Sequence, residues 1–313
     1  MGAALRSDVS VVIPTFNRAN SIVTAVNSVL AQGPRVREVI VVDDCSEDET
    51  RQLVTALAEV DDRVRLLTAD RNRGGGHARN LGIDAARAPL LAFLDSDDLW
   101  LEGKLEAQLD AIDAADAALE HGYLCFTNLE VDRGDGAPPT PWNRLRIEDT
   151  TSVASYLLEH GQAVQTSTWL LPTSLAAGIR FDDSLRRHQD YDFVLRAAAQ
   201  GCRFVYVDRV LVRYSADPKA VRVSRRVNSR PSLDWLGKAR AYLTPAQIAR
   251  FYLTSVAELH FQDAPIGAVG RSIRYGLDGH ASSVDVMRSL ARAIVPATWR
   301  AWVRQRLTGK GAP

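Results

Sequence analysis

The sequence predicts an α/β fold, in which helices flank a mostly parallel sheet and a mainly helical C-terminal extension follows. Over the first 100 residues, short apolar runs rich in β-branched residues alternate with segments of helical periodicity. Such runs are typical of strands covered on both faces, and their alternation with helices builds parallel sheets. After about residue 235 the pattern is helical without a comparable strand. A chain of 313 residues is long enough for one large domain with a smaller appendage.

The first hundred residues contain four predicted strands and three predicted helices. The strand "VSVVIP" (9–14) precedes a helix, "SIVTAVNSVLAQG" (21–33), which ends near Gly33 and Pro34. A second strand, "REVIVVDD" (37–44), completes a β-α-β unit. The later strands are expected at 63–69 and 90–95, and the later helices at 47–60 and 77–87.

The rest of the chain is expected to have three parts. Within residues 101–214, helices are predicted at 104–119 and 188–201, and strands at 123–131, 166–172 and 203–214. Residues 215–235 carry five basic side chains among small and polar residues, a pattern that predicts a mobile basic loop. Residues 236–313 form the predicted helical C-terminal region.

Composition excludes several classes of function. The 38 basic residues balance 38 acidic ones, so no global field attracts nucleic acid and no nucleic-acid partner is expected. The three cysteines form no CxxC pair, which argues against a disulfide framework or a zinc site and fits a reducing compartment. The sequence has neither a signal-peptide pattern nor an apolar run of about 20 residues. A cytoplasmic location is therefore the default expectation.

The segment "LLAFLDSDDLW" (90–100) ends a predicted strand in a cluster of carboxylates. Asp95 and Asp97 alternate at the carboxyl end of that strand, where open α/β sheets bind ligands. Their oxygens suit Mg²⁺ or Mn²⁺, and a cation would offset the repulsion between them. The alternative is that one aspartate caps the next helix. Asp98 is assigned to that helix start or to a position behind the metal ligands.

Two further aspartates, Asp43 and Asp44, end the second predicted strand. At this edge of a sheet a carboxylate can accept a hydrogen bond from a nucleobase imide or a ribose hydroxyl. The following residues suggest a helix start, because Ser46 and Glu49 fit a capping box and Asp48 favours the first turn. The capping box leaves the two strand-end aspartates unexplained.

Two more segments carry candidate site residues. "NRGGGHARN" (72–80) places three glycines before a helix and Arg79 in its first turns, which suits an anion; a glycine-rich turn with a solvated Arg79 is the alternative. "RRHQDYDF" (186–193) places Asp190 and Asp192 at a helix start, where a base and a capping role cannot be separated. His188, beside two arginines, is expected to be solvated or structural.

Taken in order, six segments resemble the successive motifs of the family 2 glycosyltransferases, which use nucleotide sugars and have the GT-A (Rossmann-like) fold. The segments are "VSVVIPTFNR", "VIVVDDCSEDET", "NRGGGHARNLGI", "LLAFLDSDDLW", "GIRFDDSLRRHQDYDFVLRAAAQG" and "VLVRY". The resemblance covers about residues 8–214. It implies a catalytic domain at 1–214, with a nucleotide-sugar half at about 1–100 and an acceptor half at about 101–214.

The resemblance also implies which residues bind the nucleotide sugar. They are Pro14, Thr15, Phe16, Asn17, Asp43, Asp44, Arg79, Asp95 and Ser96. By this resemblance Phe16 would stack on the base, Asp44 would contact the base, and Arg79 would help to hold the nucleotide.

The chemistry is implied in the same way. Asp95-Ser96-Asp97 matches the family's DxD motif, which touches the ribose and binds Mg²⁺ or Mn²⁺ on the diphosphate, with Asp97 as the main metal ligand and Asp95 as its companion. Asp190 matches the catalytic base. Gln189 departs from the pattern, since the family usually has glutamate before this aspartate, and its neutrality removes a charge that would raise the pKa of the base.

The implied function is an inverting, metal-dependent transfer of a sugar from a nucleoside diphosphate sugar, with UDP-sugar expected, to a hydroxyl group. The acceptor would be a saccharide or a lipid-linked saccharide in polysaccharide or glycoconjugate biosynthesis. The alternatives are a non-catalytic nucleotide-sugar-binding protein, suggested by Gln189, and a sugar-phosphate nucleotidylyltransferase-like enzyme. The basic loop at 215–235 could close over the diphosphate, or it is a solvated linker.

The C-terminal segment has six basic residues and one acidic residue from Asp285 onward, together with Trp299 and Trp302. Basic residues with interfacial tryptophans suit an anionic membrane surface, so peripheral contact with the inner face of the cell membrane is one expectation. A packed helical tail with a solvated basic face is the other.

Overall fold

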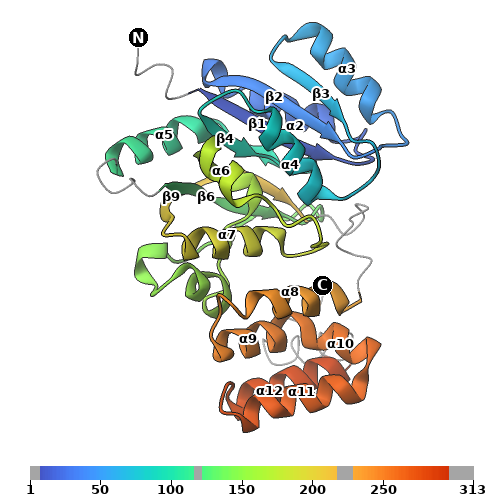
Figure 1. Cartoon of the computed structure of the whole chain (residues 1–313), viewed down its shortest axis with the longest axis vertical. Coiled ribbons are helices and arrows are strands. Elements are labelled where there is room, and N and C mark those ends of the chain that lie inside the picture. The colour runs from blue at the N-terminus through green and yellow to red at the C-terminus, as the bar shows by residue number, and fades with distance from the viewer. Residues whose placement is uncertain (1–7, 116–121, 217–227, 296–313) are drawn as a thin grey trace. The chain divides into compact units, whose positions relative to one another are not determined.

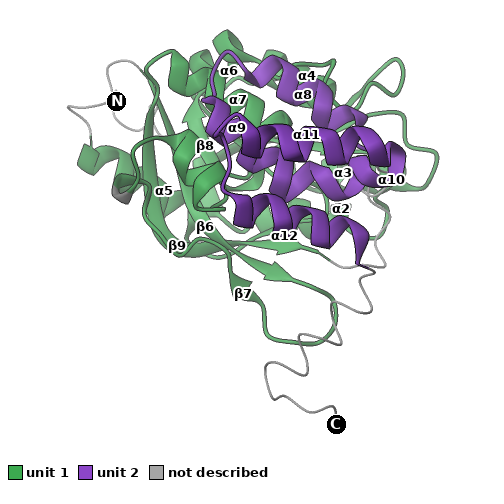
Figure 2. Cartoon of the chain, turned by 90° about the horizontal axis from the view of Figure 1, so that it is seen from below, with its two compact units in different colours: residues 1–220 green, residues 221–313 purple. Residues whose placement is uncertain are grey.

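The computed structural model describes residues 8–115, 122–216 and 228–295. They belong to two compact units, residues 1–220 and 221–313, which Figure 2 colours separately. The first unit contains the nine-stranded sheet of the described residues and the second is helical.

The first half of the sheet is parallel. The strands are β1 (Val9–Thr15), β2 (Val36–Asp43), β3 (Val64–Thr68) and β4 (Leu90–Phe93). They lie in the order β3-β2-β1-β4, and every pairing among them is parallel (Figure 1). Their carboxyl ends therefore lie along one edge, as the alternating sequence pattern predicted.

The second half of the sheet is mixed. Its strands are β5 (Leu99–Trp100), β6 (Tyr123–Asp132), β7 (Thr140–Pro141), β8 (Trp169–Pro172) and β9 (Arg203–Ser215). β8 runs antiparallel to both β4 and β6, whereas the long β6 and β9 pair in parallel. The predicted strand at 166–172 begins only at Trp169, because Thr166–Thr168 form a 3₁₀ turn whose Ser167 N–H is capped by the Gln165 side chain. The predicted α/β class with a mostly parallel core is confirmed.

Helices cover both faces of the sheet. The helices of this unit are α2 (Ile22–Leu30), α3 (Thr50–Val60), α4 (Gly75–Ala85), α5 (Lys104–Ala115), α6 (Thr173–Ile179) and α7 (Gln189–Ala199). On one face, Val11 and Ile13 of β1 share a buried core with residues of α2, α3 and α5. Val12 points to the other face, where it meets Gly82 of α4.

An aromatic cluster holds α7 against that other face. The rings of Phe93, Trp169, Phe181 and Phe193 lie with centroids 4.9 to 6.1 Å apart and are buried. Phe93 ends β4, Trp169 begins β8, and Phe193 lies in the second turn of α7. Aromatic packing of this kind adds about 0.5–1.5 kcal/mol per pair beyond the area it buries. The first turn of α7 is therefore held at a defined place near the end of β4.

The second unit is a set of short helices around buried aromatic residues. Its helices are α8 (Arg230–Ala239), α9 (Pro245–Phe251), α10 (Ala257–Asp263), α11 (Pro265–Leu277) and α12 (Ser283–Ile294), with a π-helical turn at Tyr252–Val256. Trp235 packs edge-on against Phe251, and the Tyr252 hydroxyl lies 2.7 Å from Nδ1 of His260.

The structure also corrects the end of the predicted basic loop and leaves two expectations open. Helix α8 begins at Arg230, inside the range 215–235 predicted as a loop, because Pro231 suits a first helical turn. Most of the predicted basic loop (217–227) and the tryptophan-rich end of the chain (296–313) lie outside the described residues. Within the described residues, no helix has the length and apolar character needed to cross a membrane.

Candidate active site

The predicted nucleotide-binding residues meet at the carboxyl edge of the parallel strands. Pro14 and Thr15 are the last residues of β1, and Thr15 is the register partner of Asp43 at the end of β2. Leu94, directly after β4, donates its N–H to the carbonyl of Val12, so Asp95 leaves the sheet beside the same edge. Parallel register therefore brings together side chains that are up to 81 residues apart in sequence.

The loops after β1 and β2 are tied together by Asn17. Its backbone N–H donates to Oγ of Ser46 at 2.9 Å, and its side-chain oxygen accepts from the N–H of Glu47 at 2.8 Å. Asn17 has a left-handed φ of 52° and Phe16, next to it, is half-buried. The predicted Ser46–Glu49 capping box is wrong: α3 begins at Thr50, and the Ser46 hydroxyl binds Asn17 instead.

Two buried oxygens at this edge have no hydrogen-bond partner. They are Oγ1 of Thr15 and Oδ1 of Asp43, side by side at the ends of β1 and β2. The other oxygen of Asp43 accepts from the N–H of Ser46 at 3.0 Å and lies 3.6 Å from Nε of Arg51. Buried polar atoms are normally paired, so these two oxygens, which are closed off from solvent, are exceptions to that rule.

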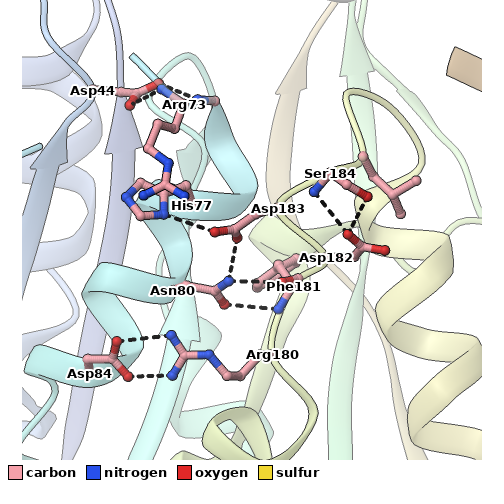
Figure 3. A network of polar contacts seen from close by, with 12 residues as sticks. Asp44, Arg73, His77, Asn80, Asp84, Arg180, Phe181, Asp182, Asp183 and Ser184 are labelled. Carbon is pink, nitrogen blue, oxygen red and sulfur yellow. Dashed lines mark hydrogen bonds and ion pairs between the residues drawn. The ribbon is translucent and has the colours of Figure 1, made fainter. Parts of the chain in front are cut away.

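The Asp44 carboxylate accepts hydrogen bonds from the backbone of the glycine-rich segment. Its two carboxylate oxygens accept from the N–H groups of Arg73 at 2.9 Å and Gly74 at 2.6 Å (Figure 3). Such charge-assisted bonds fix the segment that enters α4. Asp44 therefore lies at the predicted place, and both of its oxygens already have partners from the chain.

The three carboxylates after β4 have different environments. Asp95 accepts from Arg79 at 2.5 Å, from Gln165 at 3.1 Å and from Thr166 at 3.4 Å. Asp97 has a side chain that is 22% exposed, and its Oδ2 lies 3.7 Å from the guanidinium of Arg18. The Asp95 side chain is similarly exposed, at 26%, and it is held by protein donors.

Asp98 supports this turn from behind. It is 1% exposed and accepts from Ser167 Oγ at 2.7 Å, from Gln165 at 3.1 Å and from the N–H of Ser215 at 3.1 Å. Burial, together with the charges of Asp95 and Asp97, raises its pKa well above the usual value for a carboxyl group. Asp98 does not start the next helix, which begins at Lys104, so of the two predicted roles only the supporting one remains. Ser96 is also buried.

Arg79 lies at the centre of the site and is 9% exposed, so a solvated Arg79 is ruled out. One terminal nitrogen donates to Asp95, the other donates to Oε1 of Gln189 at 3.0 Å, and the guanidinium lies 5.3 Å from the centroid of the Phe181 ring. Its Nε is buried without a hydrogen-bond partner. Arg79 therefore connects the carboxylate turn with the start of α7.

Asp190, the predicted base, lies in the first turn of α7. Burial raises its pKa to about 6, with an opposing effect from Arg79 and a smaller raising effect from Asp95. Both charges thus lie within electrostatic reach of the Asp190 carboxyl. Asp192 instead forms a salt bridge with Arg196, and burial beside Arg187 lowers the pKa of His188 to about 3, so this histidine is neutral. His188 has a left-handed φ of 59° at the start of α7.

Sequence reasoning missed three side chains that shape this site. Arg18 lies near Asp97, and Gln165 and Ser167 hydrogen-bond to the carboxylates. Arg18 stands in the motif "VIPTFNR", so its position was a usable signal, whereas "QTST" before β8 has no pattern that predicts such contacts. Within the described residues, no group of three or more His, Cys, Asp or Glu side chains is arranged to hold a metal ion.

Comparison with known proteins identifies the family. The model of "Glycosyl transferase family 2" matches residues 10–152, which include the carboxyl edge described above. The amylovoran biosynthesis glycosyltransferase AmsB of Erwinia amylovora is 31% identical over 237 residues, which cover 75% of this chain and 78% of AmsB. The chain belongs to glycosyltransferase family 2. As a family 2 glycosyltransferase it is also similar to the succinoglycan biosynthesis protein ExoO of Rhizobium meliloti, with 37% identity over 62% of the chain and 56% of ExoO.

Solved structures agree with the fold of this glycosyltransferase. S. aureus TarS (residues 1–349, in complex with UDP-GlcNAc) superposes with a TM-score of 0.67 at 21% identity, over 98% of this chain and 93% of that one. The mannosyltransferase PcManGT from Pyrobaculum calidifontis, in complex with GDP-Man and Mn²⁺, has a TM-score of 0.59 at 16% identity, over 97% and 88% of the two chains. At these identities the likeness establishes the GT-A fold.

Proposed function

We propose that this glycosyltransferase moves a sugar, with inversion at the anomeric carbon, from a nucleoside diphosphate sugar to a hydroxyl group of a saccharide or lipid-linked saccharide. UDP-sugar is the proposed donor substrate, and polysaccharide or glycoconjugate assembly is the proposed setting. The names of AmsB and ExoO, which both refer to polysaccharide biosynthesis, support the setting. The TarS complex with UDP-GlcNAc supports the nucleotide.

One arrangement carries the proposal: a half-buried carboxyl, Asp190, beside the carboxylate turn at the sheet edge. A general base works best when its pKa lies near the working pH, and burial raises the pKa of Asp190 to about 6. Asp95 and Arg79 lie within electrostatic reach of it.

The reaction follows from these positions. Asp190 accepts the proton of the acceptor hydroxyl as that oxygen attacks the anomeric carbon. The bond from the anomeric carbon to the diphosphate breaks on the opposite side, and the diphosphate leaves with the bonding electrons. A single displacement inverts the configuration. Arg79, held by Asp95 and Gln189, keeps the charges of the site in fixed positions during this step.

A divalent cation fits the residues present. Asp97 and Asp95 are both partly exposed and offer only oxygen donors, which Mg²⁺ and Mn²⁺ prefer. Mg²⁺ usually keeps waters and substrate phosphates as its other ligands. Two carboxylates are therefore sufficient on the protein side. When bound, the cation would neutralise charge on the diphosphate.

The test is a transfer assay with a panel of nucleotide sugars and acceptors in the presence of Mn²⁺ or Mg²⁺. Asp190→Asn should bind the sugar donor with unchanged affinity and lose transfer by about 10²–10⁴-fold, the usual contribution of a positioned base. The family assignment already disfavours the nucleotidylyltransferase-like alternative.

Two outcomes contradict parts of the proposal. If Asp190→Asn transfers sugar at the wild-type rate, the base is another group. If the wild-type chain binds nucleotide sugars but transfers to no acceptor in a broad panel, the non-catalytic binding protein is the better description.

A further inference from the structure

The side chain of Gln189 connects two parts of the catalytic unit that are distant in sequence. It is the first residue of α7, directly before Asp190. Its Oε1 accepts from Nη1 of Arg79 in α4 at 3.0 Å, and its Nε2 donates to the carbonyl oxygen of Leu185 at 2.7 Å. The oxygen of the amide thus contacts α4, in the nucleotide-sugar half of the site, and its NH₂ group contacts the loop that leads into α7.

This pair of contacts needs an amide. A glutamate at the same place could accept from Arg79, but an ionised carboxylate has no hydrogen to donate to the Leu185 carbonyl. It would also add a negative charge next to Asp190. Gln189 therefore matches its local partners, although the family usually has glutamate here.

The glycines at the start of α4 accommodate the same segment. A Cβ atom on Gly76 would lie 3.0 Å from Nε2 and 3.3 Å from Cδ of Gln189. A Cβ on Gly74, whose φ is +92°, would lie 2.9 Å from the Nη1 atom of Arg186. The arginine also donates to the carbonyl of Arg73 at 3.1 Å. Close approach of residues 186–189 gives the glycines a structural reason in addition to the anion-binding one suggested by the sequence.

We propose that Gln189 is a positioning residue, which holds the first turn of α7, and with it Asp190, against the start of α4 and against the Arg79 that binds Asp95. This inference rests on the proposed function, because the positioning matters through the base role of Asp190. The inference goes beyond the proposed function because it assigns a role to Gln189, the residue at which the chain departs from the family pattern.

The contact itself is tested by a stability cycle that requires no substrate. Gly76 lies in α4 with an ordinary helical φ, so Gly→Ala there would normally stabilise the helix. We expect Gly76→Ala to lower the melting temperature of the wild-type chain, because the new methyl group displaces the Gln189 amide. In the Gln189→Ala background the same substitution should raise the melting temperature by roughly 2 °C, since the space is vacated. Gly178→Ala, in α6 with no atom within 4 Å of the added Cβ, is the matched control and should stabilise both backgrounds alike.

The positioning role is tested by kinetics. Gln189→Ala should reduce kcat by about 10–100-fold, the scale expected for a misplaced catalytic group, while the KM for the sugar donor changes less than about twofold. Gln189→Glu should also lose kcat, because it cannot donate to Leu185. Gln52→Ala, an exposed glutamine of α3, is the control and should keep wild-type kinetics.

The outcomes separate this inference from the function on which it rests. If Gly76→Ala has the same effect in both backgrounds, the Gln189 contact is absent in solution. If Gln189→Ala is less stable but keeps the wild-type kcat, the residue is structural only and the inference is wrong. If the wild-type chain neither binds nor transfers any nucleotide sugar, the proposed function fails first, and the positioning role fails with it.

Discussion

The side-chain amide of Asn80 pairs with the backbone of Phe181 as a neighbouring strand would. Oδ1 of Asn80 accepts from the Phe181 N–H at 2.9 Å, and Nδ2 donates to the Phe181 carbonyl at 2.8 Å and to Oδ1 of Asp183 at 2.7 Å (Figure 3). Beside it, His77 lies 3.0 Å from the other oxygen of Asp183. Helix α4 thus holds the segment before α7 through buried polar contacts.

Substitution of Asn80 should therefore cost more stability than its size suggests. Asn80→Asp keeps the shape but removes both donated hydrogen bonds and places a carboxylate against the Phe181 carbonyl and the Asp183 carboxylate. We expect a loss of about 3–5 kcal/mol in the free energy of unfolding, because one oxygen of the buried carboxylate would face two acceptors and no donor. Urea denaturation measures it. Asn27→Asp, at an exposed site in α2, should change stability by less than about 0.5 kcal/mol, and similar losses for the two variants would contradict the account.

The activity should depend on pH through Asp190. Its pKa is raised to about 6, and the base must be ionised, so kcat/KM should fall about tenfold per pH unit below pH 6 and be level above it. A profile that stays flat down to pH 4.5 would show that another group limits the reaction.

The raised pKa of Asp190 also affects the stability of the fold. Stability favours the protonated carboxyl, whereas activity requires the ionised one. A carboxyl whose pKa is higher in the folded chain than in the unfolded one holds its proton better when folded. Between the ordinary value of 3.8 and about 6, the contribution of Asp190 to stability therefore falls as pH rises. Asp190→Asn should remove this part of the pH dependence, which thermal unfolding at pH 4, 5, 6 and 7 can measure.

Asp97 should govern any effect of a divalent cation on binding of the sugar donor. Asp97→Asn removes the charge of the proposed main metal ligand, and we expect it to weaken Mn²⁺-dependent binding of a nucleotide sugar by at least about tenfold while leaving the melting temperature of the unliganded chain nearly unchanged. Calorimetric titration with and without Mn²⁺ is the measurement. Asp62→Asn, an exposed residue before β3, serves as control. Equal binding by wild type and Asp97→Asn would remove Asp97 from the metal site.

Lys104 is a buried cation whose partners are not carboxylates. Its Nζ donates to Gln108 Oε1 at 2.7 Å and lies 4.0 Å from the centroid of the Trp100 ring, and burial lowers its pKa to about 7. Since the unfolded lysine keeps its proton up to about pH 10.5, the free energy of unfolding should rise between pH 7 and 10, by at most about 1.4 kcal/mol per pH unit. Lys104→Met should flatten this rise and be neutral or stabilising at pH 7, because it replaces a buried charge by an apolar chain of similar length. Parallel curves for the two proteins would refute the explanation.

Most of the parallel core could be predicted because its signals are local. The apolar runs around Val12, Ile40 and Leu91 are each long enough to mark a strand, and their order predicts that their carboxyl ends meet. The capping box failed because Ser46 has two possible partners, and the one chosen, Asn17, is 29 residues away. A hydrogen bond that joins a side chain to a group so distant in the chain produces no periodic pattern in the sequence.

The sequence by itself determined the α/β class, the family resemblance, and the side chains offered at the carboxyl edge, since each depends on a short run of residues or on their order. Only the tertiary structure decided how exposed each of those side chains is and which groups it contacts. It left Asp95 and Asp97 similarly exposed, buried Asp98 behind both, and placed Arg79 between Asp95 and Gln189. The physical reason is that hydrogen bonding and burial depend on which distant segments pack together, and here α4 and the segment before α7 meet only in the folded chain.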